Sequence, residues 1–283
     1  MFYVSTKWGM GQNSMRPPII QNVSMPKRII LTSICLFVAL IAFLPQIVVI
    51  ITSFIKTNGP IFVKGFSLGS YEKIFYKLSK NIFNTFSYSF IAIIIIIIIG
   101  MLLSYLIVKR KGKITALLDL MAMSPYVIPG AVLGICILTA FNEPPLILAG
   151  TPIILIISYV IRKMPYIIRS SSALLYQMEP SIEEASINLG VSPMKTFFKI
   201  TARMMIPGVL SGAILSWITT INELSSSIML YSGKTATISV AIYTEVVRAS
   251  YGTAAASASI LTVATILSLL LFSLVTKGKG SVV

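Results

Sequence analysis

Long apolar runs alternate with short polar segments along this chain. Six runs carry almost no charge, and five of them reach the roughly 20 apolar residues that a helix needs to cross a bilayer. The pattern predicts six transmembrane helices at about residues 29–55, 81–108, 114–141, 146–161, 206–231 and 255–275. The second run contains seven consecutive isoleucines at 93–99. We still expect a helix there, because a backbone in lipid must satisfy its own hydrogen bonds.

Composition supports an all-α polytopic membrane protein. The chain is 56% hydrophobic and 11% charged, with a mean hydropathy of +0.91, whereas soluble domains carry about 25% charge. There is no histidine, and Cys35 and Cys136 both lie in apolar runs. A His-ligated metal site and a disulfide framework are therefore excluded, and we expect neither a metal nor a cofactor.

Basic residues predict the orientation of the runs. We divide the chain into an N-terminal arm at 1–28, a membrane domain at 29–276 and a tail at 277–283. Of the 23 Lys and Arg residues, 16 fall on the side of the two termini and 7 on the other. The positive-inside rule then places both termini in the cytoplasm. The first loop, at 56–81, disagrees with this rule because it carries five lysines.

The cytoplasmic segment at about 179–203 predicts a short helix with both ends marked. Pro180 opens it, and Glu183 and Glu184 fall in its first turn, where the helix dipole favours acids. Gly190 ends it. Such a helix is either a docking element for a cytoplasmic partner or an amphipathic connector lying on the lipid headgroups.

This segment resembles the EAA loop of the membrane subunits of ATP-binding-cassette (ABC) importers. The resemblance is carried by Glu184-Ala185-Ser186, followed after three residues by Gly190. It implies the fold of a type I importer permease and a coupling helix that fits a groove on a separate ATPase subunit. The coupling residues that it implies are Glu183, Glu184, Ala185, Ser186, Gly190 and Pro193. Two departures are Ser186 in place of alanine and Ala202-Arg203 in place of Leu-Pro, so we expect the exit from the loop to differ.

Three later stretches, at 222–231, 237–243 and 251–256, resemble the C-terminal half of iron(III)-type permeases. That family usually fuses two such halves, so the resemblance implies a second permease subunit or a second copy of this chain. It also implies ABC ATPase subunits, an extracytoplasmic substrate-binding protein and a prokaryotic inner membrane. The implied cargo is iron(III), with thiamine, phosphonate, polyamine or sulfate as alternatives.

Glu223 is the only acidic residue well inside an apolar run, where a charge costs about 2.5–3.5 kcal/mol at mid-bilayer. Either it faces the translocation pathway, with Asn222, Ser225 and Ser226 beside it, or it is a structural hydrogen-bond partner for a neighbouring helix. Arg162 and Lys163 either line the pathway or, as we expect, mark the cytoplasmic end of the fourth run and extend to the interface.

Two small-xxx-small patterns, Gly130 with Gly134 and Gly208 with Gly212, predict close helix packing. Gly233-Lys234-Thr235 lacks the upstream glycine of a phosphate-binding loop, so we expect this chain neither to bind nor to hydrolyse ATP. A secondary transporter or channel is the alternative from another class. It usually needs internal repeats or several intramembrane charges, and the sequence shows no clear repeat.

Overall fold

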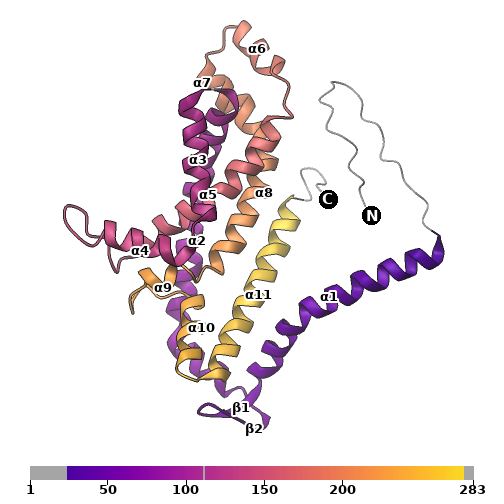
Figure 1. Ribbon diagram of the computed structural model, residues 1–283, viewed down its shortest axis with the longest axis vertical. Helices are drawn as coiled ribbons and strands as arrows, with labels where there is room; N and C mark the ends of the chain where they lie inside the picture. The colour runs from indigo at the N-terminus through magenta and orange to yellow at the C-terminus, as the bar shows by residue number, and fades with distance from the viewer. Residues whose placement is uncertain (1–23, 111, 277–283) are drawn as a thin grey trace. The chain divides into compact units, whose positions relative to one another are not determined.

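The computed structural model describes residues 24–110 and 112–276, and these are mainly helical (Figure 1). Residues 1–23 of the expected arm and the whole expected tail lie outside the described residues. The long helices are α1 (Met25–Ser53), α2 (Gly69–Lys109), α3 (Lys113–Val127), α4 (Gly130–Ala140), α5 (Pro152–Leu175), α8 (Ala202–Ile221), α10 (Ile238–Val247) and α11 (Tyr251–Thr276). The short elements are β1 (Ile55–Asn58), β2 (Ile61–Phe66), α6 (Ser181–Asn188), α7 (Pro193–Thr196), the π-helical turn η1 (Phe197–Thr201) and α9 (Ser227–Leu230).

The chain divides into two compact units, at residues 1–45 and 46–283. In the first unit, the described residues are the start of α1, where Lys27 and Arg28 precede an apolar stretch. Every described side chain of this unit is exposed. A helix that is apolar on all sides suits lipid, because its backbone groups are already paired.

The second unit opens with a β-hairpin that the all-α expectation did not include. β1 and β2 pair antiparallel, with Asn58 opposite Ile61, and Gly59 takes a φ of +60° in the two-residue turn. Such tight turns favour glycine because its φ can be positive at no steric cost. The expected loop at 56–81 is therefore an ordered hairpin followed by the first three turns of α2.

The core of the second unit is built by α2, α5 and α8. Ile93 and Ile96 of the isoleucine run are buried against Ile154 and Leu155 of α5, whereas Ile94 and Ile98 of the run are exposed. The run is helical, as predicted, and its side chains divide between a protein-facing and an outward-facing side. A second cluster near the hairpin joins the start of α2 to α10 and α11.

The number of spans differs from the six expected. Among the described residues, four helices are long and apolar enough to cross a bilayer, or five if α3 and α4 form one bent span. The helix α5 fails this test; it contains residues 152–161 of the expected fourth run, whose residues 146–151 are not helical. α5 can be less apolar because it packs against other helices of the protein. Its buried polar residues are Ser158, Lys163, Ser171 and Ser172.

Two expected runs are broken. The third is bent by 113° between α3 and α4, next to Pro129, whose missing N–H and fixed φ disfavour a continuous helix. The fifth was expected to continue to residue 231, but α8 ends at Ile221 and the chain turns before α9. The expected loop after it contains the helix α10.

All four predicted packing glycines lie at close contacts. A Cβ on Gly134 would stand 3.1 Å from the Ser226 carbonyl oxygen, and one on Gly208 would stand 2.9 Å from the Ser170 carbonyl oxygen. Gly130 is confined by the side chains of Arg162 in α5 and of Ser225, and Gly212 by a side chain and the backbone of α5. The small residues therefore let α4 approach α9 and let α8 approach α5.

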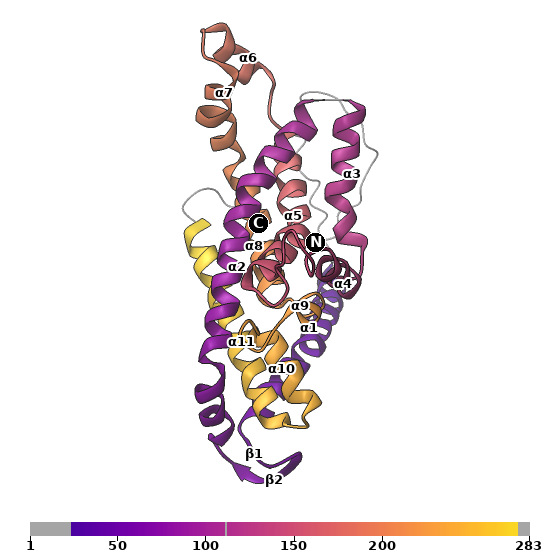
Figure 2. The same cartoon turned by 90° about the vertical axis from the view of Figure 1, so that its left-hand side faces the viewer.

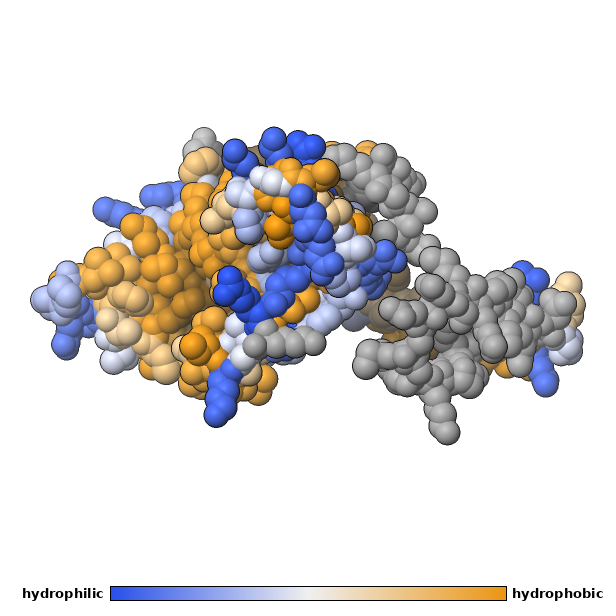
Figure 3. All heavy atoms as spheres, turned by 90° about the horizontal axis from the view of Figure 1, so that it is seen from above, coloured by the Kyte–Doolittle hydropathy of each residue, from blue (hydrophilic) through white to orange (hydrophobic). Residues whose placement is uncertain are grey.

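Within the second unit, α6 and α7 lie at one end and the hairpin lies at the other (Figures 1 and 2). Figure 3 looks down on the α6–α7 end, where hydrophilic side chains gather while hydrophobic side chains lie exposed along the flanks. This is the distribution expected of a helical domain whose flanks face lipid and whose end faces water.

Candidate functional site

The predicted short helix is present as α6, with Glu183 and Glu184 in its first turn. Two backbone hydrogen bonds close its C-terminus, one enclosed within the other. Gly190 donates to the Ile187 carbonyl at 2.9 Å, and Val191 donates to the Ser186 carbonyl at 3.2 Å. Gly190 has a φ of +83°, the left-handed conformation that this closing motif requires. The glycine predicted to end the helix therefore ends it by its backbone geometry.

One side of α6 is attached to the rest of the chain. The Glu183 carboxylate lies 3.0 Å from Lys109 Nζ at the end of α2 and accepts a 2.6 Å hydrogen bond from the Thr201 hydroxyl of η1. The Ser186 hydroxyl lies 2.9 Å from that of Thr196 and is buried. Two of the predicted coupling residues thus connect α6 to the membrane helices.

The other side of α6 is free of the chain. Glu184, Ala185, Gly190 and Pro193 are exposed. Apolar side chains are exposed among them, and Leu189, at 84%, is the most exposed of these. The others are Ile182, Ile187 and Met194. We call this set, with Glu184, the α6 outer face; an exposed apolar patch with polar neighbours is typical of an interaction surface.

The exit from this segment is a continuous helix. α7, η1 and α8 run without interruption from Pro193 to Ile221. Ala202 and Arg203, which replace the family's Leu-Pro, fall inside the helix just after the π-turn. Residues 189–192 join α6 to this helix, and no further break separates them from the end of α8.

A second cluster of charges lies where α8 breaks. Lys163 Nζ of α5 lies 2.5 Å from Glu223 Oε2, and both side chains are less than a tenth exposed. The other carboxylate oxygen accepts a 3.1 Å hydrogen bond from the Ser226 backbone N–H. Arg162 Nε lies 3.6 Å from Glu223 Oε2. We call Arg162, Lys163 and Glu223 the charged cluster.

Hydroxyl groups extend this cluster to the neighbouring elements. The Ser227 hydroxyl donates to the Glu223 carbonyl at 3.0 Å and lies 2.8 Å from the Tyr159 hydroxyl. The Ser216 hydroxyl of α8 donates to the Lys163 carbonyl at 3.1 Å. The break after α8 is therefore fixed to α5 by charge and by hydrogen bonds.

The expectation for Arg162 and Lys163 is wrong. Neither marks a solvated helix end: Lys163 is 6% exposed and both side chains point to Glu223. An ion pair is more favourable than two separate intramembrane charges, which explains this arrangement. The signal in the sequence was the presence of two cations and one acid in separate apolar runs.

The four residues proposed for the pathway divide into two pairs. Glu223 and Ser226 are buried in the charged cluster, whereas Asn222 and Ser225 are exposed. The Asn222 side chain donates to the Ile218 carbonyl at 2.8 Å. Asn222 and Ser225 are therefore accessible at the surface of this chain, whereas Glu223 and Ser226 hold the break after α8 in place from inside.

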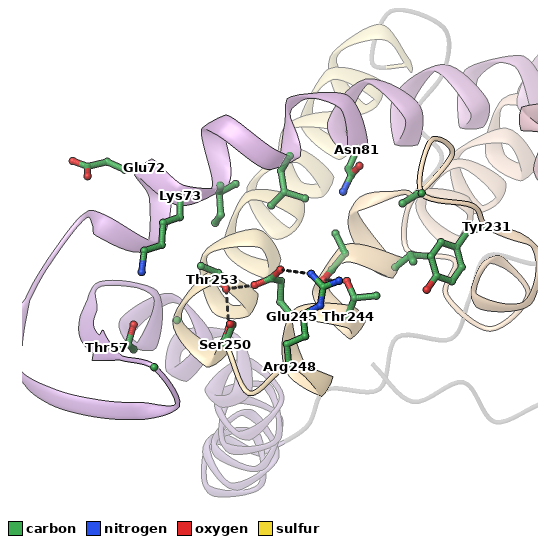
Figure 4. A pocket seen from close by; sticks show the side chains of 18 residues that line it. Thr57, Glu72, Lys73, Asn81, Tyr231, Thr244, Glu245, Arg248, Ser250 and Thr253 are labelled. Carbon is green, nitrogen blue, oxygen red and sulfur yellow. Dashed lines mark hydrogen bonds and ion pairs between the residues drawn. The ribbon is translucent and has the colours of Figure 1, made fainter.

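A cavity of about 920 Å³ at the hairpin end was not predicted (Figure 4). Its charged residues come from the start of α2 and from α10, two acidic and two basic: Glu72, Lys73, Glu245 and Arg248. The Glu245 carboxylate accepts a 2.6 Å hydrogen bond from Thr253 and lies 3.7 Å from Arg248. Because residues 150 or more positions apart line it, no local pattern could have indicated it.

Comparisons with known proteins agree on one family. The family model described as "Binding-protein-dependent transport system inner membrane component" matches residues 96–279. The "Ferric transport system permease protein FbpB" of Actinobacillus pleuropneumoniae is 32% identical over 192 residues, which are 68% of this chain and 28% of that protein. The "Probable sulfate transport system permease protein cysT" of Marchantia polymorpha is 28% identical over 188 residues, 62% of this chain and 65% of that protein.

Among solved structures, a bacterial ABC transporter involved in alginate import has a chain with a TM-score of 0.73 at 15% identity. The match covers 90% of this chain and 98% of that one, and it shows a shared fold. The chain spans only about a quarter of the length of the ferric relative. Since the family model matches well over half of its residues, the chain belongs to the binding-protein-dependent transport system inner membrane component family.

Proposed function

We propose that this chain is a permease subunit of an ABC importer, forms half of the translocation pathway and couples to a separate ATPase subunit through α6. The observation that carries the coupling role is the two-sided character of α6. Its inner side is bonded to α2 and η1 through Glu183 and to α7 through Ser186, and its outer face is exposed and partly apolar. A helix held on one side and free on the other can receive a partner and pass on its movement.

The other partners follow from the family. The pathway would lie between this chain and a second permease subunit or a second copy, and an extracytoplasmic binding protein would deliver the cargo. Both termini would lie in the cytoplasm, on the same side as α6. The chain itself would have no catalytic role, because the ATPase subunit would hydrolyse ATP.

For the cargo we propose iron(III). It is supported by the ferric permease relative, which shares 32% identity over 192 residues. Sulfate is the second candidate, favoured by the sulfate permease relative. The residues of this chain offer no three-carboxylate or histidine set in the described part that could hold a bare metal ion, so high-affinity ligands would belong to the binding protein.

The docking role is tested on the outer face. We expect Glu184→Lys and Leu189→Asp each to abolish co-purification of the ATPase subunit, because one reverses a charge and the other places a charge in an apolar contact. Gly190→Pro should have the same effect, since proline cannot adopt a φ of +83°. Glu143→Lys, the same charge change in an exposed loop after α4, is the matched control. Normal co-purification and ATP-driven uptake in all three variants would overturn the proposal.

The transmission role is tested on the inner side. We expect Glu183→Gln to keep the ATPase bound but to lower substrate uptake per ATP hydrolysed, because it weakens the contact with Lys109 while leaving the outer face intact. Thr201→Val, which removes the second contact of the same carboxylate, should reproduce this effect. The measurement is the ratio of uptake to phosphate release in proteoliposomes. A ratio equal to that of the wild type in both variants would remove Glu183 from the coupling route.

A further inference from the structure

We propose that Arg162 and Ser225 form a contact point for an oxyanion of the cargo, such as a carboxylate, sulfate or phosphonate group. The proposal rests on the proposed function, because it places the site beside the route of the cargo. It names the chemistry by which the pathway would recognise a passing molecule.

The first observation is charge. The charged cluster contains two cations and one carboxylate, so it carries a net charge of +1 within the membrane domain. Uncompensated charge in this environment is costly and marks a functional site by default. A net positive group disfavours a bare metal cation and favours an anion.

The second observation concerns the donors of Arg162. Its Nε and Nη1 atoms are buried and have no hydrogen-bond acceptor among the described residues. The nearest carboxylate oxygen, at 3.6 Å, is beyond hydrogen-bonding distance and is already bonded to Lys163. A guanidinium N–H without an acceptor donates a charge-assisted hydrogen bond to an oxyanion.

The third observation is the position of this guanidinium. A Cβ on Gly130 would overlap the Arg162 guanidinium and would lie 2.6 Å from Ser225 Cβ, so the two side chains are close neighbours at the start of α4. The Ser225 side chain is exposed, and its hydroxyl has no hydrogen bond to another described residue. The first turn of α4 adds the partial positive charge of its backbone N–H groups. An anion that contacts Ser225 would thus meet the Arg162 guanidinium and the start of α4, while the Glu223 carboxylate beside them is paired with Lys163.

A carboxylate from a second copy of this chain is a poorer match. Outside α6, the acidic residues of the described helices are Asp119 in α3 and, at the hairpin end, Glu72 in α2 and Glu245 in α10; Glu223 lies in the break after α8. Glu223 is paired with Lys163, and Asp119 lies 3.4 Å from Arg169. Because the charged cluster is net positive, an iron(III) cargo would pass this point inside a complex with anionic oxygen ligands.

The test measures the local potential by cysteine labelling in the assembled transporter. Ser225→Cys is introduced after Cys35 and Cys136, both exposed, are replaced by serine. Labelling rates are compared for an anionic and a cationic methanethiosulfonate reagent; the cysteine thiolate takes the alkylthio group to form a mixed disulfide and methanesulfinate leaves. Removing one charge about 6 Å away should change each rate about threefold in opposite directions, so Arg162→Gln should lower the anionic-to-cationic ratio about tenfold. Arg169→Gln, two turns along α5 and 57% exposed at its side chain, is the matched control and should leave the ratio unchanged.

The second part of the test is protection by named anions. Ferric citrate, sulfate and 2-aminoethylphosphonate are tested as probes, with thiamine and spermidine as cationic controls. We expect at least one anion to slow labelling, and Arg162→Gln to remove that protection. Equal rates for the two reagents, or a preference without protection, would overturn the proposal. Failure of labelling at both Ser225→Cys and a second reporter, Asn222→Cys, would also overturn it, because a partner chain would then cover the site.

Co-purification of the ATPase subunit is recorded in the same preparations. A labelling pattern as expected without a bound ATPase would retain the oxyanion site and reject the importer role. A bound ATPase without the labelling pattern would retain the importer role and reject the oxyanion site.

Discussion

Gly212→Leu should remove folded permease from the membrane fraction. A Cβ at this position would stand 2.7 Å from the Ile167 Cα atom and 2.9 Å from the Tyr166 carbonyl oxygen. Both atoms belong to the backbone of α5, so no side-chain rotation can relieve the contact. Overpacking of a core by a few methylenes costs about 1–3 kcal/mol or more, out of a total stability of about 5–15 kcal/mol. Because α5 and α8 pack along this contact, we expect the loss to exceed what the fold can absorb.

The measurement is the yield of monodisperse protein after detergent extraction, together with its thermal unfolding. Gly212→Ala should give an intermediate loss, since it introduces the clash without the further side-chain atoms. Gly233→Leu is the matched control, because a Cβ at Gly233 would meet nothing within 4 Å. A Gly212→Leu protein with the yield and unfolding temperature of the wild type would show that α5 and α8 do not pack in this way.

The apolar pattern predicted the helices best where their neighbours are lipid. The bounds of α1 and α11 lie within a few residues of the bounds expected for the first and sixth runs. α5 shows the limit of this reasoning: it is surrounded by α2, α3 and α8, so polar residues such as Ser158 and Ser171 are accepted within it. Hydropathy cannot separate a helix that faces protein from a helix that ends at the interface.

The helix α6 was predictable because its signals are local. Pro180, the two glutamates and Gly190 act within one turn of their own positions. Which glutamate points inward was not predictable, because Glu183 is turned toward Lys109, which lies 74 positions earlier in the chain. Local sequence therefore sets the bounds of this helix, while tertiary contacts decide which of its sides is free.

The charged cluster was missed for the same reason. Lys163 and Glu223 are 60 positions apart, and each was interpreted with its own run. Periodicity gives the face of a helix on which a residue lies but not the element that meets this face. A search for opposite charges in separate apolar runs would have paired them, because such charges in a membrane seldom stay unpaired.

Breaking this pair should be the second most damaging change. Lys163→Met leaves Glu223 with Arg162, at the longer distance, as its only neighbouring cation among the described residues, and Glu223→Gln leaves two cations without a carboxylate. Removing one partner of a buried ion pair costs about 3–5 kcal/mol, because the remaining charge is uncompensated. Each single variant should therefore unfold at a clearly lower temperature than the wild type, with less ATP-driven uptake.

Exchanging the two charges separates a positioning role from a pathway role for Glu223. Lys163→Glu combined with Glu223→Lys restores opposite charges but loses the Ser226 N–H contact and places Lys next to Arg162. We therefore expect partial recovery of the unfolding temperature relative to either single variant. Because the Glu223 side chain is 4% exposed, we expect uptake per folded complex to recover to a similar extent. A double variant that folds but transports nothing would mean that the carboxylate itself contacts the cargo, and a double variant less stable than both single variants would mean that the pair does not hold the break after α8 against α5.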